Sequence, residues 1–81
     1  MAQVVFGGVP EWLLEAYLVE LGGSRAAEHV VEGDGWRAAL KAQPGGGAGR
    51  IGIARVTVTF EGERAAGILA ALRKKAQRGG G

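Results

Sequence analysis

A helix with clear start and stop signals constrains the fold of this chain most. Pro10 stands where a helix favours its first residue, because the missing N–H of proline would be unpaired there anyway. Gly22 and Gly23 end the pattern, and Gly22 is expected in the left-handed conformation of a helix cap. Between them, apolar residues recur at helical spacing: Leu13, Leu14, Tyr17, Leu18 and Leu21. The apolar face of this helix must be covered by another element, so the chain must supply a sheet or a second helix.

Strand patterns surround this helix. Short strands are predicted at residues 3–6 and 29–32. A longer strand is predicted at residues 36–43, where apolar and polar side chains alternate. The sequence Gly-Asp-Gly at residues 33–35 indicates a tight turn between the second and third strands. Residues 24–27 are predicted to form a loop.

The strongest strand pattern covers residues 50–61, after a Gly-rich connector at residues 44–49. Alternation places the apolar side chains of residues 56–60 on one face and those of residues 51–53 on the other. A bulge or break near residues 54–55 would return both sets to the core. We therefore expect an irregular strand here.

A second helix is predicted from Glu63 onward, with Gly62 ending the preceding strand. Its buried stripe consists of Ala65, Ile68, Leu69, Leu72 and Ala76. Two amphipathic helices with one apolar face each should cover a single face of an antiparallel sheet, which predicts an α+β fold. We expect one domain at residues 1–78 and a flexible glycine tail at residues 79–81.

Composition narrows the setting of the chain. The 81 residues include no cysteine, so disulfides and thiolate chemistry are excluded. No apolar run is long enough for a transmembrane helix, and the N-terminus does not resemble a signal peptide. We therefore expect a cytoplasmic protein without membrane contact. The net charge of +2 alone implies no nucleic-acid partner.

Several motifs fail as sites. The GxGxxG pattern at residues 47–52 leads into a strand, whereas a dinucleotide site needs a helix there. His29 is the only histidine and shows no second ligand nearby in the sequence, and Ser24 lies in no nucleophile motif. Glu11 and Glu15 lie one helical turn apart and are interpreted as solvated surface. We therefore predict no enzyme activity, no catalytic or cofactor-binding residue, no cofactor and no metal ligand.

Four cations crowd the end of the second helix: Arg73, Lys74, Lys75 and Arg78. They could bind an anion or nucleic acid. The alternative, which we prefer, is that cations stabilise the negative end of the helix dipole.

The chain ends in Gly80-Gly81, after Arg78-Gly79. Sulfur carriers and ubiquitin-like modifiers end in an unhindered Gly-Gly, because an activating enzyme must thread the bare chain to adenylate its terminal carboxylate. Here the tail follows a predicted helix, whereas a β-grasp carrier presents its tail from a strand. A simple flexible end is the alternative interpretation.

Several segments together resemble the C-terminal domain of MoaD-related proteins, a bacterial domain of unknown function: residues 6–15, 17–18, 22–23 and 56–62, and the closing Arg-Gly-Gly-Gly. In that family the domain follows a ubiquitin-like sulfur-carrier domain. The resemblance implies a TBP-like order β-α-β-β-β-β-α, in which residues 50–61 would count as two strands. It implies no catalytic residue.

We therefore expect a non-enzymatic accessory or interaction domain linked to sulfur-carrier or molybdopterin-type cofactor biosynthesis. The expected partner is a protein, either a sulfur carrier or its activating enzyme. One alternative is that Gly80-Gly81 is itself activated, by adenylation and thiocarboxylation or by conjugation. The other is anion or nucleic-acid binding through the basic end of the second helix.

Overall fold

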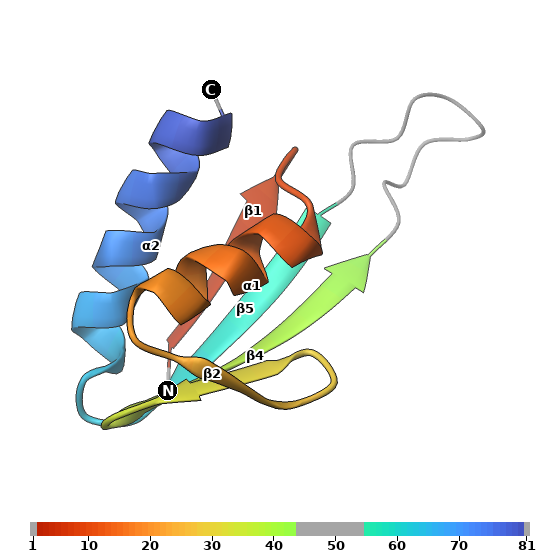
Figure 1. The fold of residues 1–81 in the computed structure, drawn as a ribbon. Helices are drawn as coiled ribbons and strands as arrows, with labels where there is room; N and C mark the ends of the chain where they lie inside the picture. The colour runs from red at the N-terminus through yellow and green to blue at the C-terminus, as the bar shows by residue number, and fades with distance from the viewer. Residues whose placement is uncertain (1, 44–54, 81) are drawn as a thin grey trace.

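The computed structural model describes residues 2–43 and 55–80, with the side chains of residues 2–43 and 55–77. Its elements follow the order β-α-β-β-β-β-α that the family resemblance implied (Figure 1). They are β1 (Ala2–Gly7), α1 (Glu11–Glu20), β2 (Ser24–Ala27), β3 (Val30–Gly33), β4 (Trp36–Gln43), β5 (Arg55–Glu61) and α2 (Ala65–Gly80).

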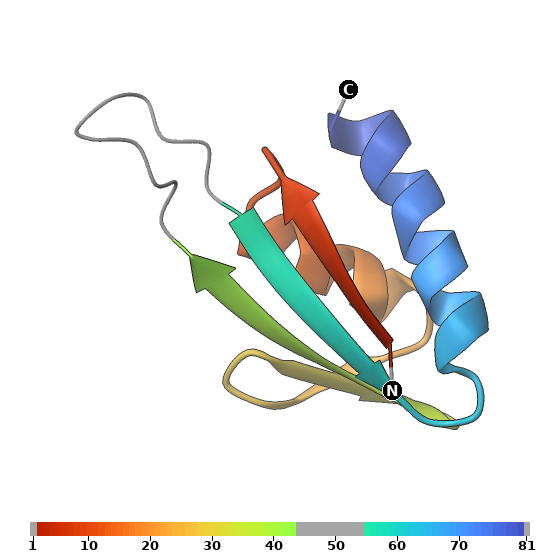
Figure 2. The ribbon, with the colours of Figure 1, turned by 180° about the vertical axis from the view of Figure 1, so that it is seen from behind.

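The strands form one antiparallel sheet in the order β1-β5-β4-β3-β2, so β1 and β2 are its edges. The first strand pairs with the last, from Ala2 opposite Phe60 to Gly7 opposite Arg55. Both helices lie on the same face of the sheet, and its other face is open (Figures 1 and 2). The α+β fold expected from the sequence is confirmed. Among the described residues, no helix has the length and apolar character needed to cross a membrane.

The core lies between the sheet and the two helices. In β4 the predicted alternation is confirmed as far as Leu40, since Trp36, Ala38 and Leu40 are buried and the residues between them are exposed. Ala42, predicted on the same face, is exposed. In β5 the apolar residues from Val56 to Phe60 face the same core. The helices contribute the fully buried side chains Leu14, Leu18 and Leu72. Each helix is held to the sheet mainly by these apolar contacts.

The prediction of a loop at residues 24–27 is wrong. These residues form β2, which pairs with β3 in an antiparallel hairpin and has an irregularity between Arg25 and Ala27. All four residues are exposed, so no alternation of apolar and polar residues marks the strand in the sequence. With β2 present, four strands separate the helices without dividing residues 50–61. Residues 50–54, which include the start of the break predicted near residues 54–55, fall outside the described residues.

The helix ends differ in how well they were predicted. Gly22 has φ 107°, and the N–H of Gly23 donates to the Leu18 carbonyl at 3.1 Å, which confirms the glycine cap of α1. The second helix begins at Ala65, after a turn, rather than at Glu63. The backbone of Gly79 and Gly80 continues α2, where the sequence predicted a flexible tail. Glycine costs only about 1 kcal/mol in a helix, which need not stop the last turn of a long one. Gly81 lies outside the described residues.

Candidate functional site

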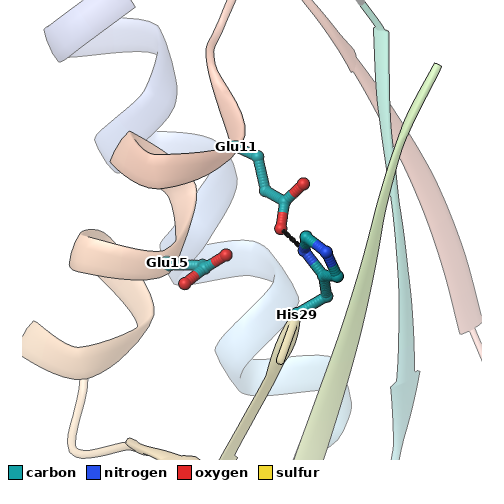
Figure 3. A group of neighbouring side chains, drawn as sticks. All are labelled: Glu11, Glu15 and His29. Carbon is teal, nitrogen blue, oxygen red and sulfur yellow. Dashed lines mark hydrogen bonds and ion pairs between the residues drawn. The ribbon is translucent and has the colours of Figure 1, made fainter. Parts of the chain in front are cut away.

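Two carboxylates and the imidazole meet beside the first helix (Figure 3). Glu11 and Glu15 project from α1 toward His29, which lies in the turn between β2 and β3. One ligand-type atom from each side chain lies within 4.8 Å of the other two. Nδ1 of His29 is hydrogen-bonded to Oε2 of Glu11, and Arg25 places Nε 3.1 Å from Oε1 of Glu15. Among the described residues, no other group of three or more His, Cys, Asp or Glu side chains comes together in this way.

Local structure positions each member of this cluster. Glu11 and Glu15 are one helical turn apart, so they share a face of α1. His29 has φ 64°, a left-handed conformation that histidine adopts more readily than most residues. Its carbonyl accepts the N–H of Leu40 at 2.8 Å, which fixes the turn to β4. The two carboxylate side chains are only 14% and 16% exposed, whereas the imidazole is 54% exposed. The carboxylate side chains are therefore largely covered by neighbouring atoms, whereas the imidazole is open to solvent.

The charges of the cluster influence each other. Hydrogen bonding with Glu11, followed by the negative charge of Glu11, raises the pKa of His29 above 6.5. The pKa of Glu15 is lowered, mainly by hydrogen bonding with Glu11 and further by Arg25, while burial acts in the opposite direction. Two carboxylates on one helix face would repel each other, and the imidazole and the guanidinium offset that repulsion.

This cluster corrects the interpretation of its three members. The sequence showed no partner for His29, and it indicated solvated surface for Glu11 and Glu15. The structure brings all three together. The one signal in the sequence was the helical spacing of the two glutamates, and nothing local to His29 indicated that its turn would lie beside α1.

A second feature is a groove between β1 and the C-terminal half of α2, with a volume of about 450 Å³. Its lining includes Val4, Val5, Phe6, Val9, Arg73 and Gln77. Successive residues of a strand point to opposite faces of the sheet. The groove is lined by four consecutive residues of β1, Val4 to Gly7, and therefore runs along the edge of that strand and not beneath one face.

The edge of β1 is open to pairing. Among the strands of the described residues, β5 is the only neighbour of β1, and β1 contains neither a charged residue nor a proline. Val5 is 55% exposed beside the unpaired edge. The opposite edge is less suited to pairing, since β2 has four residues and an irregular register and exposes Arg25. Natural proteins protect sheet edges with such short, irregular or charged strands, and β1 has none of these protections.

The predicted basic cluster is divided between two sides of α2. Arg73 lines the groove at β1. Lys75 faces α1, where its Nζ lies 2.7 Å from Oε1 of Glu20 and 5.6 Å from the ring centroid of Tyr17. Lys74 is exposed, and the side chain of Arg78 lies outside the described residues. Anion binding by the four cations together stays a prediction.

Comparison with known proteins gives one result that bears on identity. No curated protein matches this chain. A family model described as "archaeal MoaD-like protein" matches residues 2–81. The MoaD-like part of the resemblance found in the sequence is thereby confirmed, in an archaeal family rather than in the bacterial fused domain. The match covers the chain from β1 to the final glycine, and the chain therefore belongs to the family of archaeal MoaD-like proteins.

Proposed function

We propose that this chain is a non-enzymatic interaction domain in a sulfur-carrier or molybdopterin-type pathway, and that it binds the C-terminal glycine tail of a carrier protein along β1. Membership of a MoaD-like family supports the pathway. The groove at the unprotected edge of β1 is the observation that supports the mode of binding.

An extended peptide can satisfy the free edge of this strand. Alternate residues of β1 direct their N–H and C=O groups away from β5, and an added strand pairs with them. The six residues of β1 span about 20 Å, enough for a tail of similar length. Since α2 lies close beside the edge, a tail without side chains fits this space better than a bulky segment.

The positive charge in the groove can attract the negative C-terminal carboxylate of such a tail. Most of the residues that line the groove are apolar in type, and Arg73 is its one cationic side chain among the described residues. A guanidinium binds a carboxylate through two parallel hydrogen bonds. We therefore place the terminal carboxylate of the bound tail at Arg73, with the preceding residues alongside β1.

The test is an NMR titration of the full chain with a hexapeptide that ends in Gly-Gly and carries a free terminal carboxylate. Shift changes are expected in β1 and in the half of α2 that contains Arg73. Arg73→Gln and C-terminal amidation of the peptide should each weaken binding about tenfold, as expected for loss of one charge-assisted interaction. Lys74→Gln, a change to the neighbouring exposed cation, should have little effect.

Three results would contradict this proposal. They are an absence of shift changes, changes confined to the open face of the sheet, and equal affinity for the acid and the amide. Sedimentation of the chain alone provides a further check. A stable dimer that Val5→Lys dissociates would show that a second copy occupies the edge instead.

A second candidate function is that the chain is itself a carrier activated at Gly81, with Gly80 beside it. The family match, which extends through residue 81, favours this candidate. To reach an activating enzyme the end of α2 would have to unwind, and glycine makes that step inexpensive. Intact-mass spectrometry after incubation with ATP, a sulfur donor and an activating enzyme tests it. A thiocarboxylate at Gly81, absent when one residue is added after it, would support carrier function; an unchanged mass beside a working carrier would exclude it.

A further inference from the structure

We propose that Glu11, Glu15 and His29 form a binding site for a divalent transition-metal ion, with Zn²⁺ as the best match. The proposal is independent of peptide binding at β1, because the cluster is built from α1 and the β2–β3 turn. None of its members lines the groove.

The ligand types select the class of metal. One imidazole nitrogen with two carboxylates is a set that Zn²⁺ accepts, and three protein ligands leave a fourth position for water. Mg²⁺ and Ca²⁺ prefer ligand sets made of oxygen alone, so the histidine disfavours them. In the usual order of affinities, Zn²⁺ also binds such sites more tightly than Mn²⁺ or Fe²⁺.

The distances are close to those that an ion requires. Metal–ligand bonds of about 2.0–2.1 Å in a tetrahedron place neighbouring ligand atoms about 3.3 Å apart. The three ligand atoms lie within 4.8 Å of one another, so the longest separation must shrink by at most about 1.5 Å. Torsions within two glutamate side chains cover such a movement, while the helix and the turn stay in place.

Charge and access also suit an ion. The two carboxylate side chains are only partly accessible to water, and a shielded pair of negative charges attracts a cation more strongly than an exposed pair does. The imidazole is exposed, so an ion in solvent can reach the cluster at His29. Arg25 competes with an ion for Glu15, because its guanidinium already forms an ion pair with Oε1 of that carboxylate. An ion must displace this contact or use the other oxygen.

The sequence makes the experiment clean, because the full chain contains one histidine and no cysteine. Calorimetric titration of the untagged chain with ZnCl₂ at neutral pH should show one ion bound per chain, with much weaker binding of MgCl₂. His29→Asn and Glu11→Gln should each weaken zinc binding by at least about tenfold, the lower range for perturbed metal sites. Asparagine tolerates the left-handed backbone of the turn, so the first variant keeps the fold.

Two further variants distinguish this site from binding by scattered surface carboxylates. Glu32→Gln removes a carboxylate that pairs with Arg37 on the sheet, and it should change zinc affinity by less than about twofold. Arg25→Gln removes the competing cation, and it should strengthen zinc binding. The proposal is overturned by an absence of zinc binding, by wild-type affinity in His29→Asn or Glu11→Gln, by equal affinity for Mg²⁺, or by weaker binding in Arg25→Gln. Circular dichroism of each variant confirms that the fold is retained.

Discussion

The backbone at Gly62 leaves no room for a side chain. This residue connects β5 to the turn before α2 with φ 113°. A Cβ atom there would lie 2.3 Å from the carbonyl oxygen of Gly35 and 2.8 Å from Cα of Trp36. Both are backbone atoms, so neither can rotate away. Gly62→Ala must therefore move β5 away from the β3–β4 turn. This movement would also break the hydrogen bond that the Arg64 N–H donates to the Gly35 carbonyl at 2.9 Å.

The cost of this substitution has three sources. A left-handed backbone costs a residue with a Cβ about 1–2 kcal/mol. Forcing an atom into a filled space costs about 1–3 kcal/mol, and loss of the Arg64–Gly35 hydrogen bond costs about 1 kcal/mol. Together they amount to about 3–6 kcal/mol, against a total stability of about 4–12 kcal/mol for a chain of this length. We expect the melting temperature to fall by at least about 12 °C.

Two other glycines provide matched controls. Gly35 has φ 81°, but a Cβ there would first meet the flexible side chain of Arg64, at 3.0 Å. Gly35→Ala should therefore cost only the backbone term, about 1–2 kcal/mol. Gly67 lies within α2, and a Cβ there would meet nothing within 4 Å. Gly67→Ala should stabilise the protein by about 0.5–1 kcal/mol.

The assay is thermal and urea unfolding of the wild type and the three variants, followed by far-UV circular dichroism. Gly67→Ala should be the most stable, followed by the wild type, Gly35→Ala and Gly62→Ala. If Gly62→Ala were within about 1 kcal/mol of Gly35→Ala, the reasoning from backbone contact would be refuted. A Gly67→Ala variant less stable than the wild type would refute the reasoning from open space.

Three further predictions concern other parts of the molecule. An NMR titration should give His29 a pKa above 6.5, and Glu11→Gln should lower it. Because the pKa of His29 is raised in the folded state, protonated His29 stabilises the fold at low pH, and this stabilisation is lost as pH rises through that pKa. If the wild type and His29→Asn showed the same dependence of unfolding free energy on pH, this reasoning would be contradicted. Leu72→Ala should lower the urea-unfolding free energy by about 2–5 kcal/mol, and a loss below about 1 kcal/mol would show that this fully buried side chain does not hold α2 on the sheet. Lys75→Ala should cost less than about 1 kcal/mol, since its pair with Glu20 is partly exposed, and a loss that high salt does not reduce would contradict an ionic origin.

The elements predicted correctly from the sequence have signals that act over a few residues. The glycine cap at Gly22 and the Asp-Gly turn depend on local backbone conformation. The faces of β4 and β5 follow from alternation over four or five residues, and burial on one side of the sheet requires that alternation. Such patterns can be recognised in a single sequence because they depend only on residues that are close together in the chain.

The edge strand β2 lacks such a signal. All of its residues are exposed, so burial imposes no alternation on them. Its strand conformation comes from pairing with β3, where Ser24 lies opposite Glu32 and Arg25 opposite Val31. Pairing through backbone groups is nearly independent of side-chain type, which explains why a polar stretch with two alanines resembled a loop.

That missed strand also concealed the cluster beside α1. Once β2 and β3 form a hairpin, its turn contains only Glu28 and His29, so the position of the imidazole is fixed by the sheet. Both strands of the hairpin contact α1, and the turn therefore brings His29 to the face that carries Glu11 and Glu15. With a loop in place of β2, nothing would fix His29 relative to the helix. A site assembled by an exposed edge hairpin is therefore harder to predict than one in the core, since neither its scaffold nor its ligands produce a pattern of burial.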